Sequence, residues 1–322
     1  MNEKYKITPI ILSGGSGKRL WPISKQSFPK QFLNLPFGSN FSLFQKTILR
    51  LKNNFFTEPI IICSAEHKFI VKDQLENINA GFKEIIVEPL SRNTAPAICI
   101  ASLKVYEEDH NGMIMVFPSD HFILDEKLFL NKLNDFLLQN NDNNILFGLE
   151  PREPKTSYGY IKVRTTKSQK KISVEKFIEK PDLETAKKMF KEKKFLWNSG
   201  IFFLNVKKTL GQFKKYSPST LISCSNALKK SKKDLNFLYL EKKNFSECNN
   251  ISFDYAILEK IKDLQVFPLN LIWNDLGSWN AIWEVEKKDK SNNVLIGKSK
   301  VKNVKNSLIV TDNDSNIINN LS

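Results

Sequence analysis

A glycine-rich loop that directly follows a short apolar run constrains the fold of this chain more than any other feature. The run Pro9–Leu12 is typical of a buried β-strand. Three glycines and then two cations come after it: Gly14, Gly15, Gly17, Lys18 and Arg19. Because glycine has no Cβ, the backbone N–H groups of such a loop can close around a phosphate.

A further cation, Lys30, follows in the segment Pro29-Lys30-Gln31. Arg19 and Lys30 both lie next to proline-containing segments, and together they are suited to neutralising a polyphosphate from two sides. We therefore interpret Pro9–Leu33 as a site for a nucleoside triphosphate that takes part in a transfer reaction.

Two commoner glycine motifs do not fit this loop. A Walker A loop requires Ser or Thr after Gly-Lys, whereas Arg19 follows Gly17-Lys18 and Leu12 stands where its first glycine would be. A dinucleotide-binding fingerprint would need a glycine in place of Leu20. A plain turn between a strand and a helix is the remaining alternative, and the basic, proline-containing continuation of the loop argues against it.

The charge of the chain is high and spread along the sequence. A net charge of +15 suggests nucleic-acid binding, but only five of the 49 basic residues are arginine, and the lysines are scattered. Scattered lysines usually mark solvated faces, so we expect no dedicated nucleic-acid surface. The positive field would still favour an anionic substrate.

The four cysteines show no CxxC pairing and no metal-ligand spacing with the histidines. Cys63 and Cys99 lie in apolar runs, where they are expected to pack as small hydrophobic residues. The N-terminus lacks an apolar signal region, and no apolar run reaches the length of a membrane span. We expect a cytoplasmic protein with reduced thiols and no membrane partner.

Apolar, β-rich runs alternate with helical patterns through the first half of the chain. Strands are predicted at Pro59–Cys63, Ile85–Val87, Met113–Phe117 and Ile145–Gly148, and helices at His67–Ile78, Ala95–Glu108 and Lys127–Leu138. This alternation predicts a Rossmann-like α/β fold, with a mostly parallel sheet covered by helices on both faces. Ligands of such sheets bind beyond the carboxyl ends of the strands, where the glycine loop lies.

The rest of the chain divides into a strand-rich middle, a helical part and a short tail. The middle part is expected to form a second lobe that receives an acceptor substrate, with strands at Gly159–Val163, Ile172–Glu179 and Ser199–Leu204. Helices are predicted at Val206–Tyr216, Ser219–Lys230 and Asp254–Lys262. Short β segments such as Val294–Gly297 and Ser307–Val310 are typical of the start of a β-helix-like tail. We therefore predict a main domain over residues 1–288 and a β tail over residues 289–322.

The segment GGSGKRLWPIS…FPKQF resembles the nucleotide-binding signature of the sugar-phosphate nucleotidyltransferases. Within that family, Trp21 is typical of the members that join GTP to mannose 1-phosphate. Lys18 and Lys25 stand where a small hydroxyl residue and arginine are common, and both keep or add positive charge. The resemblance runs from about Thr8 to Glu286 and implies a nucleotide-diphospho-sugar transferase fold. Many bacterial relatives continue into a phosphomannose isomerase domain, which we expect this chain, ending at Ser322, to lack.

The resemblance implies roles for residues at the phosphate and base ends of a nucleotide. Arg19 and Lys30 would be catalytic. The expected nucleotide contacts are Leu12, Gly14, Gly15, Gly17, Lys18, Arg92, Asn93 and Ser119. Asn93 or Thr94 is also a plausible N-cap of the following helix, and both roles are compatible.

Two aspartates resemble the metal-binding positions of the family. Asp120 follows the predicted strand Met113–Phe117, and Asp275 lies in Trp273-Asn274-Asp275-Leu276-Gly277. A helix cap or a turn is the alternative for each. The resemblance assigns both to Mg²⁺. His121 is expected to be structural, because an attacking phosphate oxygen is already ionised and needs no general base.

Further segments resemble the sugar-phosphate pocket of the family. The candidates there are Gly159, Glu179, Lys180, Asn198 and Asp254. For Glu179-Lys180 the alternative is a surface ion pair, and for Asp254 it is a helix N-cap.

The resemblance as a whole implies transfer of GMP from GTP to α-D-mannose 1-phosphate, giving GDP-mannose and diphosphate. Three alternatives stay open at this point. They are a nucleotidyltransferase for another pair, such as glucose 1-phosphate with UTP or dTTP, a non-catalytic regulatory subunit that senses a sugar nucleotide, and a basic nucleic-acid-binding protein. A homodimer is also left open.

Overall fold

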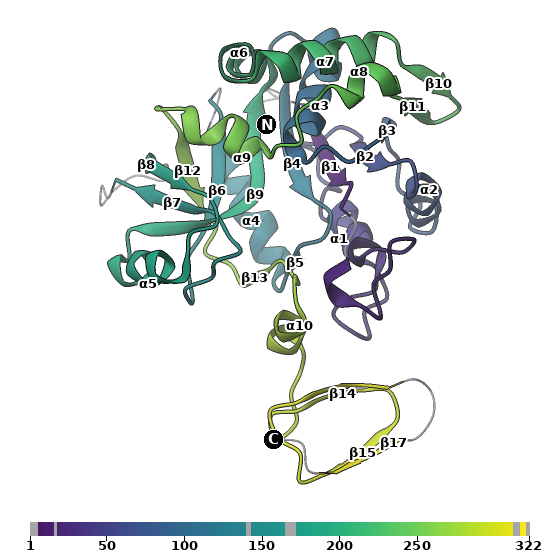
Figure 1. The fold of residues 1–322 in the computed structure, drawn as a ribbon, viewed down its shortest axis with the longest axis vertical. Coiled ribbons are helices and arrows are strands. Elements are labelled where there is room, and N and C mark those ends of the chain that lie inside the picture. Colours follow the sequence, from purple (N-terminus) through teal and green to yellow (C-terminus); the bar gives the residue numbers. More distant parts are fainter. Residues whose placement is uncertain (1–5, 16–17, 140–142, 165–171, 312–315, 320–322) are drawn as a thin grey trace.

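The computed structural model describes residues 6–15, 18–139, 143–164, 172–311 and 316–319. Its centre is an 11-stranded sheet (Figure 1). In spatial order the strands are β10 (Lys232–Asp234), β11 (Phe237–Tyr239), β3 (Glu84–Glu88), β2 (Ile60–Ser64), β1 (Ile7–Ser13), β4 (Met113–Pro118), β9 (Phe195–Asn205), β6 (Ile145–Leu149), β12 (Gln265–Pro268), β8 (Ile172–Ile178) and β7 (Tyr160–Val163).

The sheet is mixed, so the expectation of a mostly parallel sheet holds for only part of it. Strands β11, β3, β2, β1 and β4 run parallel to one another, as predicted for the nucleotide-binding half. Strand β9 then pairs antiparallel with both β4 and β6. An apolar run buried on both faces has the same pattern in either direction, so the sequence does not indicate which strands are reversed.

Both faces of the sheet are buried, which explains the apolar runs of its strands. Ile7 and Ile11 of β1 belong to one core cluster, whereas Ile10, between them, belongs to the other. Side chains of a strand alternate between the two faces, so a strand such as β1 supplies both cores. The first core also takes residues of α1 (Leu43–Leu49), α2 (Lys68–Glu76), α4 (Glu126–Leu137) and α5 (Leu183–Glu192), and the second takes residues of α3 (Thr94–Glu108), α6 (Val206–Tyr216), α7 (Pro218–Lys229), α8 (Lys242–Ser246) and α9 (Phe253–Ala256).

The expected helices are confirmed within one or two residues, with one exception. The helix predicted over Asp254–Lys262 is wrong, because α9 ends at Ala256 and a separate 3₁₀ turn covers Leu258–Lys260. Ile257 interrupts the helix, since its backbone leaves the helical region (φ −129°, ψ −58°) while its side chain is fully buried. Ser252 is the N-cap of α9, so Asp254 is not the cap. Asn93 caps α3, as expected.

The strand-rich middle of the chain continues the main sheet. Strands β7, β8 and β9 pair with one another or with β4, β6 and β12, so they do not form a separate sheet. In Figure 1, β7, β8 and α5 lie on the side of the molecule opposite β2, β3 and α2. The halves that are expected to bind the acceptor and the nucleotide therefore belong to one continuous sheet.

The last part of the chain lies beyond helix α10 (Trp279–Val285), away from the main sheet (Figure 1). It forms two small parallel pairs, β14 (Val294–Ile296) with β16 (Leu308–Val310) and β15 (Ser299–Lys302) with β17 (Asn316–Asn319). A third small pair, β5 (Phe122–Ile123) with β13 (Trp273–Asn274), joins the segment after β4 to the segment before α10. The domain boundary and the β-helix-like character of the tail stay predictions.

Among the described residues, no helix is both long and apolar enough to cross a membrane. The four cysteines are buried and free, which for Cys63 and Cys99 agrees with the expected packing as small hydrophobic residues.

Candidate active site

A cavity of about 430 Å³ lies at the carboxyl ends of β1, β3 and β4. The sequence-predicted residues that line it are Leu12, Gly14, Gly15, Asn93, Ser119, Asp120 and Asp254. Parallel strands end at one edge of a sheet, so loops from distant parts of the sequence meet there. The glycine loop, the start of α3 and the turn after β4 thus surround one space.

Lys30 approaches this space from inside the protein. Its ammonium lies 2.8 Å from Oδ2 of Asp120, and it also donates to the backbone carbonyl of Asp275. The lysine side chain is 5% exposed, whereas that of Asp120 is 35% exposed. Three of the predicted catalytic and metal-binding residues are therefore in contact.

The Asp120 carboxylate is ionised. Burial by itself would raise the pKa of Asp120, but the Lys30 ammonium and His121 outweigh it and lower that pKa to about 2. The neighbouring His121 packs edge-on against Trp273, with 4.9 Å between ring centroids. Burial lowers the pKa of His121. The structural role of His121 stays a prediction, which this packing against Trp273 favours.

Asp275 lies in a tight turn beside Arg19. Its Oδ1 accepts hydrogen bonds from the Tyr158 hydroxyl at 3.0 Å and from the Gly277 N–H at 3.1 Å. A Cβ at Gly277 would lie 2.6 Å from Oδ2 of Asp275 and 3.2 Å from Nη1 of Arg19. Only glycine leaves room at that position for the carboxylate and the guanidinium together.

The carboxylates fit a hard divalent cation that is shared with a substrate. In the part of the chain that the structure describes, no group of three or more His, Cys, Asp or Glu side chains could hold a metal ion. Mg²⁺, however, is commonly bound by one or two carboxylates together with substrate phosphates. Asp120 is ionised and partly exposed, and Oδ2 of Asp275 accepts none of the hydrogen bonds that hold Oδ1. The carboxylate oxygens of Asp120 and Asp275 are therefore suitable ligands for Mg²⁺.

The five predicted sugar-phosphate residues come together in a second cluster. The Asn198 amide donates to Oδ1 of Asp254 at 2.7 Å, and Lys180 donates to Oε1 of Glu179 at 2.8 Å. A Cβ at Gly159 would lie 2.5 Å from Oε2 of Glu179, so this carboxylate packs against the glycine backbone. Burial and the nearby Glu179 carboxylate raise the pKa of Asp254. Because Asp254 also lines the cavity, the cluster adjoins the nucleotide space.

Not all predicted nucleotide contacts reach the cavity. Nη2 of Arg92 donates to the Ser246 carbonyl at 2.7 Å, and Arg92 is not among the lining residues. Gly17 lies outside the described residues, and the described part of Lys18 is its backbone in a 3₁₀ turn.

A larger hollow, of about 700 Å³, lies between α10 and the tail, and it is lined by Pro22, Ile23, Trp279, Asn280, Trp283, Asn306, Leu308 and Val310. None of these side chains titrates, so the hollow does not offer the charges that phosphate transfer requires.

Comparison with known proteins decides the family. The model of the nucleotidyl transferase family matches residues 8–292. The chain belongs to the nucleotidyltransferase family.

Several relatives of this nucleotidyltransferase are known. A mannose-1-phosphate guanylyltransferase of Escherichia coli is 39% identical over 313 residues, which are 95% of this chain and 67% of the relative. The alginate biosynthesis protein AlgA of Pseudomonas syringae is 38% identical over 94% of this chain and 62% of its own length. The chain thus spans about two thirds of the length of these curated relatives.

A solved structure extends the likeness to the whole fold. The crystal structure titled mannose-1-phosphate geranyltransferase, from Thermus thermophilus, superposes with a TM-score of 0.82 at 25% identity. The match covers 98% of this chain and 90% of that one. The nucleotide-diphospho-sugar transferase type of α/β fold is therefore confirmed for this nucleotidyltransferase.

Sequence reasoning missed three residues of the nucleotidyltransferase site. The Gln31 amide donates to the Gly15 carbonyl at 3.0 Å and so holds the glycine loop. Tyr158 positions Asp275, and Glu88 lines the cavity. Gln31 and Tyr158 adjoin Lys30 and Gly159, so their place next to predicted residues was a usable signal. Glu88 begins the segment that contains the predicted contacts Arg92 and Asn93, so its place beside them was likewise a usable signal.

Proposed function

We propose that this nucleotidyltransferase transfers GMP from GTP to α-D-mannose 1-phosphate, giving GDP-mannose and diphosphate. The observation that carries the proposal is the contact of Lys30 with Asp120 and with the Asp275 backbone, at the edge of a cavity bounded by the glycine loop. The curated relatives named mannose-1-phosphate guanylyltransferase support the choice of nucleotide and sugar.

The charge of each residue would determine which part of the substrates it binds. Phosphates of the nucleotide would lie against the backbone of Gly14 and Gly15, with Arg19 and Lys30 opposing the charge that moves onto the leaving diphosphate. Glu179 and Asn198 would bind sugar hydroxyls, and Lys180 would hold the phosphate of the sugar. The two groups share one space through Asp254, so an oxygen of the sugar phosphate would reach the α-phosphorus in line.

Asp120 and Asp275 would bind Mg²⁺ together with the nucleotide phosphates. When bound, the ion would neutralise phosphate charge and align the triphosphate. Lys30 would have a second role in this arrangement, because its ammonium balances the charge of Asp120 and holds the Asp275 backbone before any ligand binds.

We further infer that residues 1–288 form the catalytic domain and residues 289–322 a separate tail. The parallel pairs of the tail lie outside the main sheet, which supports this division. The sulfur atoms of Cys224 and Cys248 lie 3.6 Å apart as hydrogen-bonded thiols without a disulfide bond, and free thiols support the cytoplasmic location that the sequence predicts.

The test is diphosphate release by the purified protein with Mg²⁺. GTP, UTP, dTTP and ATP are each combined with mannose 1-phosphate or glucose 1-phosphate. We expect release with GTP and mannose 1-phosphate. Release with a different pair would keep the reaction type and overturn the specificity. No release with any pair, from protein shown to be folded by circular dichroism, would favour a regulatory subunit.

A further inference from the structure

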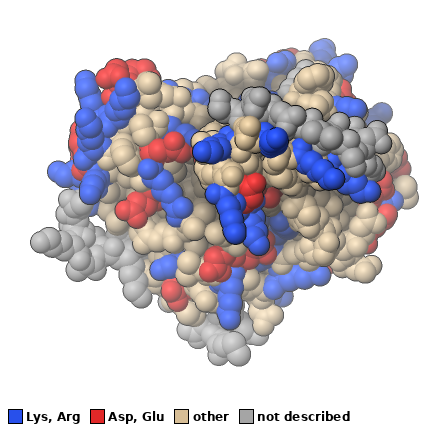
Figure 2. Space-filling model, turned by 90° about the horizontal axis from the view of Figure 1, so that it is seen from below, with Lys and Arg blue, Asp and Glu red and all other residues tan. Residues whose placement is uncertain are grey.

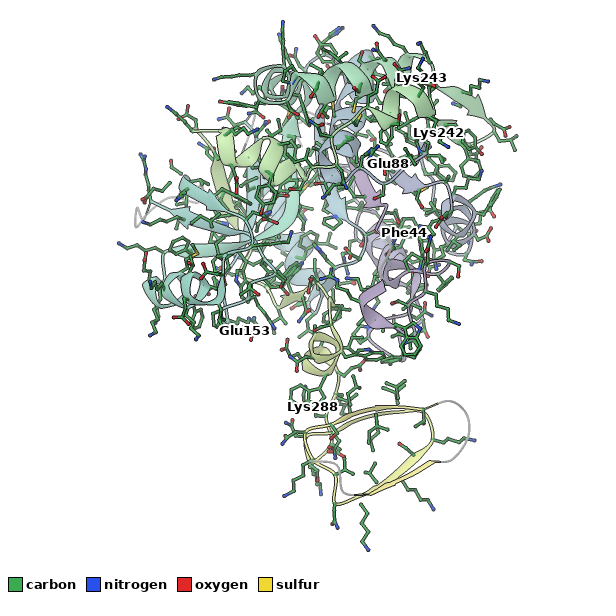
Figure 3. The ribbon with its side chains drawn as sticks, in the orientation of Figure 1. Phe44, Glu88, Glu153, Lys242, Lys243 and Lys288 are labelled. Carbon is green, nitrogen blue, oxygen red and sulfur yellow. The ribbon has the colours of Figure 1, made fainter. Side chains whose placement is uncertain are left out.

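Arg50 is a buried arginine whose guanidinium is only partly paired. It lies at the C-terminal end of α1, and its side chain is 4% exposed. Nε donates to Oε1 of Glu126 at 3.3 Å, and Nη1 donates to Oγ1 of Thr47 at 3.5 Å. Nη2 is buried, and among the described residues it has no hydrogen-bond partner. Helix α1 packs into the first core through residues such as Phe44, which Figure 3 shows inside the molecule, so packing holds the arginine in place.

The Arg50 side chain borders a small cavity that His121 also lines. The cavity has a volume of about 10 Å³, and most of its other walls are apolar side chains such as Phe117 and Phe129. Nδ1 of His121 is buried too, and no residue that the structure describes is hydrogen-bonded to it. Two residues with a buried, unpaired polar atom thus share one cavity, whose size suits a single water molecule.

His121 connects this cavity to the predicted metal site. Its Nε2 lies 3.6 Å from Oδ1 of Asp120, while Lys30 pairs with Oδ2 at 2.8 Å. The contacts of the ring with Trp273 and with the backbone at Gly200 are apolar, so they do not distinguish its nitrogens from its carbons. A hydrogen bond at Nδ1 would do so, because it would keep Nε2 turned toward the carboxylate. The structural role predicted for His121 would then be to hold the carboxylate oxygen that Lys30 leaves free.

We propose that one buried water molecule joins Nη2 of Arg50 to Nδ1 of His121, and that Arg50 thereby positions the Asp120 carboxylate through the imidazole ring. This inference rests on the proposed function and deepens it, since it adds a positioning residue that does not line the nucleotide cavity. Water both donates and accepts hydrogen bonds, so it can accept from the guanidinium and pair with Nδ1 in either protonation state. It would also satisfy two buried polar atoms, which folded proteins rarely leave unpaired.

A high-resolution crystal structure of the wild-type protein tests the water directly. We expect one ordered water within hydrogen-bond distance of both Nη2 of Arg50 and Nδ1 of His121. A cavity without a water, or a water that reaches only one of these atoms, would overturn the inference. The result does not depend on turnover, so it is separate from the test of the proposed function.

Arg50→Met tests the positioning role, because it removes the guanidinium and keeps an unbranched side chain. We expect kcat for GDP-mannose formation to fall, and the Mg²⁺ concentration for half-maximal rate to rise, each by on the order of 10-fold. The KM for mannose 1-phosphate should stay near its wild-type value. Glu126→Gln is the matched control, since it breaks the same ion pair but leaves Nη2 in place. Equal losses in Glu126→Gln and Arg50→Met would assign the effect to the ion pair and overturn the inference.

A double-mutant cycle with His121→Phe separates this role from a general loss of stability. Phenylalanine keeps a ring against Trp273 but has no nitrogen to bind the water. Arg50→Met should therefore lower kcat in the wild type and have little further effect in His121→Phe. Independent, multiplying losses would mean that Arg50 does not act through His121, and would contradict the inference.

Two further outcomes are distinguished by the same experiments. If thermal unfolding shows that Arg50→Met does not fold, Arg50→Lys replaces it in the cycle, since lysine keeps a charge for Glu126 but lacks the second branch of the guanidinium. No turnover by folded wild-type protein with any nucleotide would overturn the proposed function and the positioning role with it. The crystal structure would then still decide whether the water joins Arg50 to His121.

Discussion

The Lys30 ammonium lies 2.8 Å from the Asp120 carboxylate and also donates to the Asp275 backbone, so one buried cation joins three distant segments of the chain. Because the Lys30 side chain is buried, packing holds its ammonium in one place. The charges needed around a triphosphate are thus arranged before it binds.

Lys30→Ala should lower kcat/KM for GDP-mannose formation by on the order of 10²-fold or more, because it removes the cation nearest the transferred phosphate. Steady-state diphosphate release measures this effect. Lys187→Ala is a suitable control, since Lys187 pairs only with Glu184 on the surface of α5. Near-normal turnover by Lys30→Ala would contradict the assignment of the site.

Chelation of divalent metal should abolish turnover, and Asp275→Asn should raise the Mg²⁺ concentration required for half-maximal rate. A neutral amide binds Mg²⁺ more weakly than a carboxylate, while it can still hold the turn at Gly277. Rates are measured across a Mg²⁺ titration at saturating substrates. Asp73→Asn, an exposed change on α2, should leave the titration unchanged. An unaltered midpoint in Asp275→Asn would remove this residue from the metal site.

Glu179→Gln should raise KM for mannose 1-phosphate by on the order of 10-fold, because a charged hydrogen bond to a hydroxyl becomes neutral. The KM for GTP should stay near its wild-type value, since Glu179 belongs to the sugar cluster and does not line the nucleotide cavity. Glu175→Gln serves as control, since Glu175 lies on β8, the strand that ends just before Glu179, and pairs with Lys162 at the surface. A parallel rise of both KM values would place Glu179 elsewhere in the mechanism.

Glu88 should make the ligand-free protein less stable as pH rises. Its pKa is raised from 4.5 to about 8 in the folded state, so the folded protein holds a proton that the unfolded chain loses. The stabilisation is complete below about pH 4.5 and is lost as pH rises to about 8. The nearby thiols stay protonated, because burial raises the pKa of Cys63, and a hydrogen bond with Cys224 raises that of Cys248.

Thermal unfolding of wild type and Glu88→Gln at pH 5 and pH 8 measures this linkage. The variant should gain melting temperature relative to the wild type as pH increases, since its amide does not titrate. A difference that is independent of pH would show that Glu88 is ionised in the folded protein without cost.

The distribution of charge on the surface does not support the alternative of a nucleic-acid-binding protein. On the face shown in Figure 2, lysine and arginine side chains lie in separate groups with aspartate and glutamate between them. Such interspersed charges are typical of a solvated surface.

Local patterns predicted much of the site, because phosphate binding depends on short segments. The glycine loop, Lys30, Asp120 and the sugar cluster were all recognisable from the sequence. In the structure Gly14, Gly15, Asp120 and Asp254 line one cavity, with Lys30 in contact with Asp120 and Asn198 in contact with Asp254. Arg92 shows the limit of such reasoning, since the structure turns its guanidinium toward Ser246. Tyr158 adjoins the predicted Gly159, but its contact with Asp275 joins two distant segments of the chain and could not be read from either of them.

The sequence alone determined the element types, the strand–loop–helix order and the identity of the charged groups, since these follow from the spacing of apolar residues and from local motifs. Only the tertiary structure decided the reversed direction of β9, the pairing of Lys30 with Asp120, and the isolation of Glu88. These features depend on which strands become neighbours and on which polar groups lose water when the cores close, and both are properties of the packed chain.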